Sequence, residues 1–243
     1  MATETETEMG VESATQPRTG RILAIIAGVA AVVLVGVVLA VIFTSTATAE
    51  TSNVKGQGDM GVWAVDGVTI IRSEDGIEVS MEMPRPMPGT YSYPEGGEQP
   101  NGSIHPEIEQ GEEEVFTLWF FNFNYPELCI DPYVCRFEDI VSEDGTPPPA
   151  EGGIYQVDGV IVDGDIIKMN GEVLVGTPAR TGADLTSPLC SHVHIGMAPH
   201  GKALTGDDLA TQLSSGVGSP EWWWPAEFEW IDSEKGCTPQ PAG

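Results

Sequence analysis

Residues 77–83 read Ile-Glu-Val-Ser-Met-Glu-Met, an unbroken alternation of apolar and polar side chains. Strict alternation is typical of a β-strand that buries one face, so the four apolar side chains are expected to lie in a core. Residues 61–71 carry a similar pattern, and the Asp75-Gly76 step between the two stretches favours a tight turn. We therefore expect a β-hairpin at this point of the chain.

Further strands are predicted along the rest of the sequence. Residues 115–124 (VFTLWFFNFN) are apolar on both faces, as expected for a central strand that is covered on both sides. Residues 153–162 and 166–175 predict a second hairpin. More strands are expected at 190–197 and 226–232, and a short helix is expected at 207–213. The 29 glycines and 19 prolines favour turns. Seven or so strands with almost no helix predict an all-β fold, an antiparallel β-sandwich such as the Ig-like type.

Residues 22–43 contain no charged or polar side chain. As a helix they would extend over roughly 33 Å, which matches the bilayer core. Arg18 and Arg21 precede the segment, and positive flanks stay in the cytoplasm. We therefore expect a disordered cytoplasmic tail (1–21), a single transmembrane anchor (22–43), a linker (44–59) and an extracytoplasmic β domain (60–240).

The alternative is a cleaved signal sequence. Ala47-Thr48-Ala49 fits an A-x-A cleavage site, so the domain would be secreted after cleavage near Ala49. The apolar run is longer than a usual signal core, which favours the retained anchor. Both interpretations export the domain.

The charge balance restricts the partners. The chain has 10 Lys and Arg against 37 Asp and Glu, a formal net charge of −27. Such a surface repels phosphates, so nucleic acid is not an expected partner. The membrane is the expected partner of residues 22–43. A protein or glycan partner stays open; Trp222, Trp223 and Trp224 either stack on sugars or pack over the end of the fold.

Four cysteines, Cys129, Cys135, Cys190 and Cys237, suggest two disulfides in an exported domain. Three pairings are formally possible. Closure of the short loop between Cys129 and Cys135 is the simplest choice, and it leaves Cys190 to pair with Cys237.

Two stretches carry a resemblance. Residues 118–129 (LWFFNFNYPELC), with Cys135 after them, resemble a group of uncharacterised secreted bacterial proteins that share F-N-x-P-E-x-C and a second nearby Cys. The pattern of His194, five residues and His200-Gly201 is also similar to theirs. The resemblance extends over residues 60–240 and implies a secreted, disulfide-bonded β domain, with no catalytic activity implied. Residues 192–196 (HVHIG) are similar to the CHRD domain, a β module of chordin and of bacterial secreted proteins, which implies a CHRD-like sandwich.

Three of the four histidines fall within nine residues: His192, His194 and His200. Residues two apart on a strand share a face, so His192 and His194 are expected to be neighbours. If the chain turns at Gly196 and Pro199, His200 approaches them, and three imidazoles would suit copper or zinc. The alternative is that the three histidines have structural roles without metal.

The sequence thus predicts a membrane-anchored, acidic binding or cell-envelope component without a catalytic site or an organic cofactor. A copper- or zinc-binding protein that uses the three histidines is the alternative function. No nucleophile motif or phosphate-binding loop indicates an enzyme.

Overall fold

The first predicted hairpin is present in the computed structural model, which describes residues 48–56, 61–87, 108–109, 111–142, 146–214 and 224–228. β2 (Val62–Ser73) and β3 (Gly76–Pro84) pair antiparallel, with Ser73 opposite Gly76 across a two-residue turn. All four apolar side chains of the alternating stretch are buried in β3, and the residues between them are exposed. The period of two therefore predicted both the strand and its buried face.

A four-stranded antiparallel sheet forms around this hairpin, in the order β1-β2-β3-β6. β6 (Ile166–Leu174) pairs with β3, and β1 (Thr48–Lys55) pairs with β2. The prediction of a linker at 44–59 is wrong over Thr48–Lys55, because this segment is the edge strand of the sheet. Its one fully buried side chain, Val54, gives too weak a sequence signal for a strand.

A five-stranded antiparallel sheet has the order β7-β5-β4-β8-β9. β4 (Glu114–Phe123) is its central strand and is buried along nearly its whole length, as the apolar pattern predicted. Its hydrogen-bonded neighbours are β5 and β8. The other four strands are β5 (Gly152–Val162), β7 (Thr181–Gly182), β8 (His192–Lys202) and β9 (Trp224–Phe228).

The prediction of a second hairpin is wrong, although both of its strands exist. β5 pairs with β4 and β7, whereas β6 pairs with β3 in the other sheet. Gly171 of β6 passes so close to Val157 of β5 that an added Cβ would lie 2.7 Å from the Val157 Cβ. The chain therefore passes from one sheet to the other at residues 163–165. Sequence alternation shows which side chains of a strand are buried, but it does not show which sheet the strand joins.

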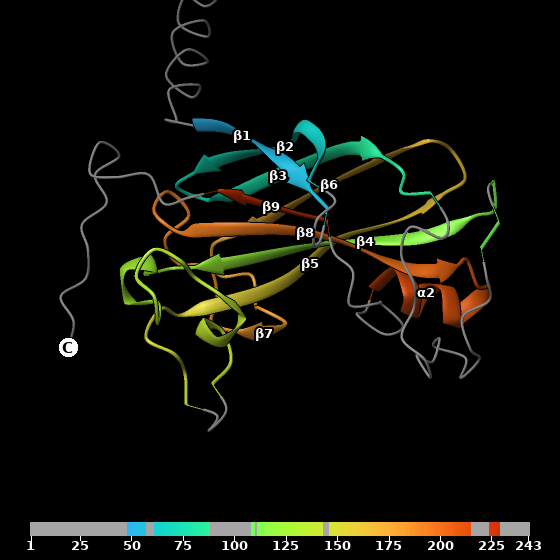
Figure 1. The fold of residues 1–243 in the computed structure, drawn as a ribbon. Coiled ribbons are helices and arrows are strands. Elements are labelled where there is room, and N and C mark those ends of the chain that lie inside the picture. The colour runs from blue at the N-terminus through green and yellow to red at the C-terminus, as the bar shows by residue number, and fades with distance from the viewer. Residues whose placement is uncertain are drawn as a thin grey trace, which may run out of the picture. The chain divides into compact units, whose positions relative to one another are not determined.

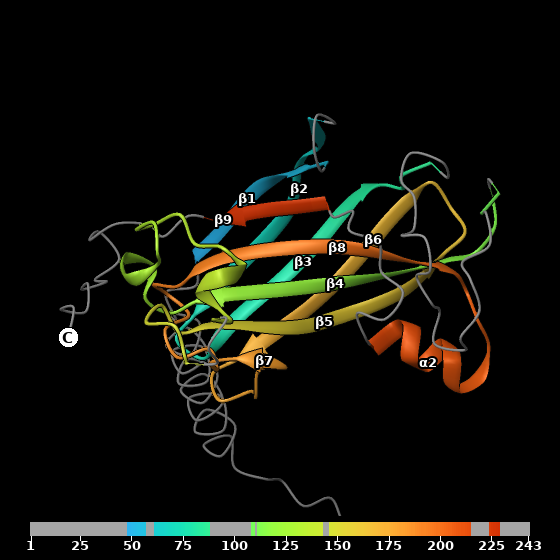
Figure 2. The ribbon, with the colours of Figure 1, turned by 60° about the horizontal axis from the view of Figure 1, so that its bottom comes forward.

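The two sheets form separate layers around a shared core (Figures 1 and 2). One buried cluster combines side chains of β2, β3 and β6 with side chains of β4, β8 and β9, among them Ile70, Met83 and Ile167 from one sheet and Phe116, Phe120 and Met197 from the other. The all-β, antiparallel fold class is thus confirmed.

Two segments lie on the outer face of the five-stranded sheet (Figure 1). The connection between β4 and β5, which we call the arm (residues 124–151), contains the short helices η2 (Pro126–Leu128) and η3 (Phe137–Asp139). The helix α2 (Gly206–Ser214) matches the predicted helix and contacts β4 and β5. A second buried cluster joins the arm to the sheet through residues such as Cys129, Ile140, Trp119 and Phe123.

The predicted tail and anchor (1–43) lie outside the described residues. Within the residues that are described, no helix is both long and apolar enough to cross a membrane.

Candidate binding cavity and histidine pair

The outer face of the five-stranded sheet is apolar where β4 and β8 run side by side. Phe116, Leu118 and Phe120 of β4 point into the shared core, so the alternate residues Trp119, Phe121 and Phe123 point outward. Val193, Ile195 and Met197 point inward from β8, which places His192 and His194 on the outer face beside these aromatic rings.

His192 and His194 form a close pair, as the strand spacing predicted. Their Nε2 atoms are 2.6 Å apart, and the ring centroids are separated by 4.6 Å. Both imidazole rings pack edge to face with Phe123. The centroid of the Phe123 ring lies 6.0 Å from that of His192 and 5.4 Å from that of His194. His192 is buried and His194 is half-buried. The pair therefore sits in an aromatic, poorly hydrated environment.

Both imidazoles are neutral at neutral pH. The pKa of His192 is lowered to about 4, mainly by burial and in part by His194 and Arg72, while Glu227 acts in the opposite direction. Burial also lowers the pKa of His194 to about 4. A neutral pair can share one N–H between the two Nε2 atoms, one nitrogen donating and the other accepting. Nδ1 of His192 is buried and has no hydrogen-bond partner among the residues that the structure describes.

His200 does not join the pair, so the predicted convergence of three imidazoles is wrong. β8 continues through Gly196 and Pro199 instead of turning, and six residues of strand place His200 about 20 Å from His194. Proline has no backbone N–H to donate to a neighbouring strand. Pro199 is tolerated because β9 pairs with β8 only over Val193–Met197, so no described strand on the β9 side of Pro199 requires that hydrogen bond. Within the described part of the chain, no group of three or more His, Cys, Asp or Glu is arranged to hold a metal.

His200 instead supports the aromatic face. It is fully buried, and its Nε2 lies 2.6 Å from Oγ1 of Thr117. The same Oγ1 accepts a hydrogen bond from Nε1 of Trp119 at 2.8 Å. The guanidinium of Arg180 lies 5.7 Å from the Trp119 ring, within the range of a cation–π contact. This chain of contacts fixes the indole at the sheet surface.

A cavity of about 950 Å³ opens over this face. The sheet forms the floor of the cavity, and the arm contributes Phe137 and Ile140. The lining residues that belong to the sheet are Trp119, Phe121, Phe123, Ile154, Ile195, Gly196 and Pro225. His194 is the one ionisable side chain among the described residues that line it. The volume lies at the upper end of the range for small-molecule sites, which are typically apolar with a few polar groups.

Sequence reasoning missed this cavity, although its signal was present. The stretch VFTLWFFNFN is apolar on both faces, which requires a cover on each side. Among the described residues, the four-stranded sheet covers the inner face, and the arm and α2 contact parts of the outer face. The cavity lies over the part of β4 that carries Trp119, Phe121 and Phe123.

The predicted short disulfide closes the base of the arm. Cys129 and Cys135 are bonded to each other and buried. Cys190 is also disulfide-bonded, and its predicted partner Cys237 lies outside the described residues. Trp224 is part of β9, whereas Trp222 and Trp223 also lie outside the described residues. The disulfide restricts the segment that presents Phe137 and Ile140 to the cavity.

No protein-family model matches the sequence, and comparison with curated proteins and with solved structures finds no significant match either. The assignment of a function therefore rests on the geometry of the outer face.

Proposed function

We propose that this protein is an exported, non-enzymatic binding domain that takes a small, neutral aromatic molecule into the cavity over β4 and β8. The aromatic floor of the cavity is the single observation that carries this proposal. Trp119, Phe121 and Phe123 offer faces and edges on which a planar ligand would stack. The overall charge of −27 makes an anionic ligand unfavourable, and burying any charged group against the apolar lining is costly, so a neutral ligand fits best.

His194 supplies the polar contact in this proposal. Its neutral imidazole borders an otherwise apolar lining and can donate or accept one hydrogen bond. A hydroxyl or carbonyl group at one end of the ligand would satisfy it. The combination of one polar contact and a large apolar wall is the usual basis of orientation in such sites.

The finer fold class belongs to the same proposal: the two sheets form a β-sandwich of the Ig-like or CHRD-like kind. Support comes from the single core that both sheets share and from the resemblance to secreted β domains. Export rests on residues 22–43, with the cytoplasm on the side of Arg18 and Arg21.

Retention of the anchor is the favoured form of the export proposal. Cleavage after Ala49 would remove Thr48 and Ala49, which belong to β1 and pair with Arg72 and Ile71. It would also place a positively charged amino terminus on Glu50, beside the buried Arg72 guanidinium. Mass spectrometry of the exported protein tests this point: an N-terminus at Glu50 contradicts retention, and a chain that keeps residues 22–43 supports it.

The binding proposal is tested with the neutral fluorophore N-phenyl-1-naphthylamine, whose emission rises in apolar sites. We expect saturable binding of one probe per chain. Phe121→Lys places a charge at the half-buried edge of the floor and should weaken binding at least about tenfold, because burying an unpaired charge is unfavourable.

Leu174→Lys is the matched control. Leu174 is 45% exposed, lies at the end of β6 and does not line the cavity, so the same change of charge there should leave probe affinity unaltered. Equal affinity in the wild type and in folded Phe121→Lys protein would refute the cavity as the binding site.

A further inference from the structure

The two imidazoles at the edge of the cavity are bonded to each other. Nε2 of His192 and Nε2 of His194 lie 2.6 Å apart, and the buried Nδ1 of His192 has no hydrogen-bond partner within the described part of the chain. Phe123 packs against both rings. The strand spacing thus directs two ring nitrogens, one as N–H donor and one as acceptor, toward each other in aromatic surroundings.

We propose that His192 and His194 form a two-ligand site for monovalent copper. Imidazole nitrogen is a good copper ligand, and both nitrogens already face each other. This inference is independent of the proposed function, because it needs no occupant in the cavity.

The number of ligands selects the metal. Zinc and divalent copper prefer four or more ligands, and no third His, Cys, Asp or Glu among the described residues is arranged with the pair. Monovalent copper is stable with two imidazoles in a nearly linear arrangement. It also carries one charge, and the cost of moving an ion out of water rises with the square of its charge.

The cavity supplies the room that the metal needs. A metal–imidazole bond is about 2.0 Å long, so two nitrogens in line with a metal must lie farther apart than they do now. His194 lines the cavity, so its ring can rotate outward while His192 stays buried. The acidic surface, with a net charge of −27, raises the concentration of cations near the domain.

The test is a titration of the full-length chain, purified without a histidine tag, freed of metal and kept anaerobic with ascorbate. Copper(I) is supplied as its bicinchoninate complex, whose absorbance falls when the protein removes the metal. We expect one copper per chain. X-ray absorption of the loaded protein should report two nitrogen ligands.

Variants locate the site. His194→Gln and His192→Asn should each reduce copper uptake to below about 0.1 equivalent. His200→Gln is the matched control, since His200 lies on the same strand but bonds Thr117, and it should keep full uptake. Circular dichroism confirms that each variant is folded; His194→Gln serves if the more buried His192 variant does not fold.

Three results would overturn the proposal: no copper(I) uptake by the wild type, uptake unchanged in folded His194→Gln protein, or four or more ligands in the absorption spectrum. Ile154→Lys separates this site from the proposed ligand cavity, because Ile154 lines the cavity but lies on β5, one strand farther from His194 than Phe121. This variant should no longer bind the naphthylamine probe but should still take up one copper. A failure of the ligand proposal can therefore be distinguished from a failure of the copper proposal.

Discussion

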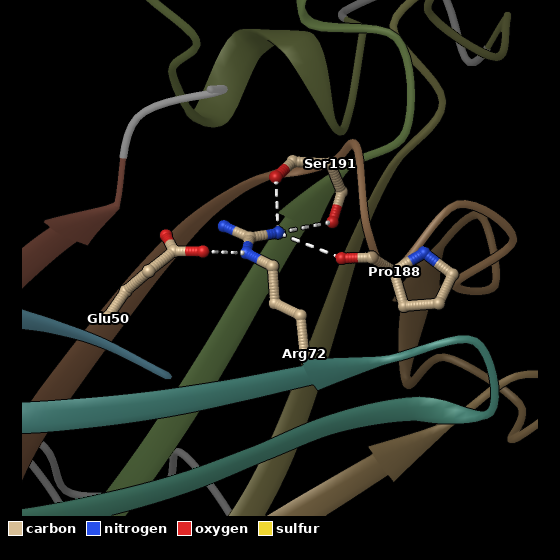
Figure 3. A network of polar contacts seen from close by, with 4 residues as sticks. All are labelled: Glu50, Arg72, Pro188 and Ser191. Atoms are coloured by element: carbon tan, nitrogen blue, oxygen red, sulfur yellow. Dashed lines mark hydrogen bonds and ion pairs between the residues drawn. The ribbon is translucent and has the colours of Figure 1, made fainter. Parts of the chain in front are cut away.

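Arg72 of β2 donates a hydrogen bond from Nη1 to the carbonyl oxygen of Ser191, 2.7 Å away, just before β8 of the other sheet (Figure 3). The same nitrogen donates to the carbonyl oxygen of Pro188 at 2.9 Å, and Nε pairs with Glu50 of β1 at 3.1 Å. Arg72 is 2% exposed, and burial lowers its pKa although Glu50 acts in the opposite direction. One side chain therefore connects both sheets next to the histidine pair.

Arg72→Met is expected to destabilise the domain by about 3–5 kcal/mol, because it leaves Glu50 and two carbonyl oxygens without their donor. The midpoint of urea unfolding measures the effect. Lys168→Met removes an exposed ion pair with Glu82 and should change stability by about 0–1 kcal/mol. Equal effects of the two substitutions would contradict a role for burial.

Thr117→Val should disturb both the fold and the cavity. Oγ1 of Thr117 is the acceptor for Nε1 of Trp119 and the partner of Nε2 of His200, and all three residues are buried. We expect a loss of about 2–4 kcal/mol, since the partners of a buried hydroxyl lose their bonds. Binding of the naphthylamine probe should also weaken. Thr181→Val, at an exposed position of β7, is the control; a folded Thr117→Val protein with unchanged probe affinity would show that Trp119 needs no support.

Tyr155→Phe should change stability in a way that depends on pH. The Tyr155 oxygen accepts a hydrogen bond from the Leu185 amide at 2.6 Å, so its loss is expected to cost about 1–3 kcal/mol at neutral pH. Burial raises the pKa of Tyr155 to about 12, whereas an unfolded tyrosine titrates near 10. The neutral phenol thus contributes stability that is complete below pH 10 and declines between pH 10 and 12, by at most about 1.4 kcal/mol per pH unit.

Urea unfolding of the wild type and of Tyr155→Phe is measured at pH 7 and at pH 11. Comparing the two proteins at each pH separates the contribution of the Tyr155 phenol from that of other groups that titrate in this range. The difference in stability between the wild type and Tyr155→Phe should shrink at pH 11, because only the wild type loses the phenol contribution. Tyr133→Phe, at an exposed tyrosine of the arm, should show no such change. A constant difference at both pH values would contradict the shifted pKa.

Gly171→Ala is expected to destabilise the domain by about 1–3 kcal/mol, since the added Cβ would lie 2.8 Å from the Val157 carbonyl oxygen. Gly164→Ala is the control, because a Cβ there meets nothing within 4 Å. Thermal unfolding of both variants tests whether the close crossing of β5 and β6 holds the sheets together. A Gly171→Ala protein as stable as Gly164→Ala would contradict that contact.

Local pattern determined much of the fold. The alternation in residues 77–83 identified β3 and its buried face, the two-sided apolar stretch identified β4 as a central strand, and Cys129 and Cys135 were near enough in sequence to bond. The spacing of His192 and His194 placed their rings together. Each of these features depends on residues that are neighbours along the chain, so the pleat of a strand or the closure of a short loop was sufficient to predict it.

Tertiary structure alone decided how these pieces combine. Alternation does not show which strand pairs with which, so β5 and β6 entered different sheets and Thr48–Lys55 became an edge strand. β8 continues through Pro199 and so keeps His200 away from the pair, and Pro199 is tolerated there because β9 pairs only with Val193–Met197. The place of the cavity depends on how the arm packs beside β4 and β8, which is a contact between distant segments of the chain. The sequence by itself thus determined the strands and their buried faces, whereas packing between distant parts of the chain determined the partners of each strand and the place of the candidate site.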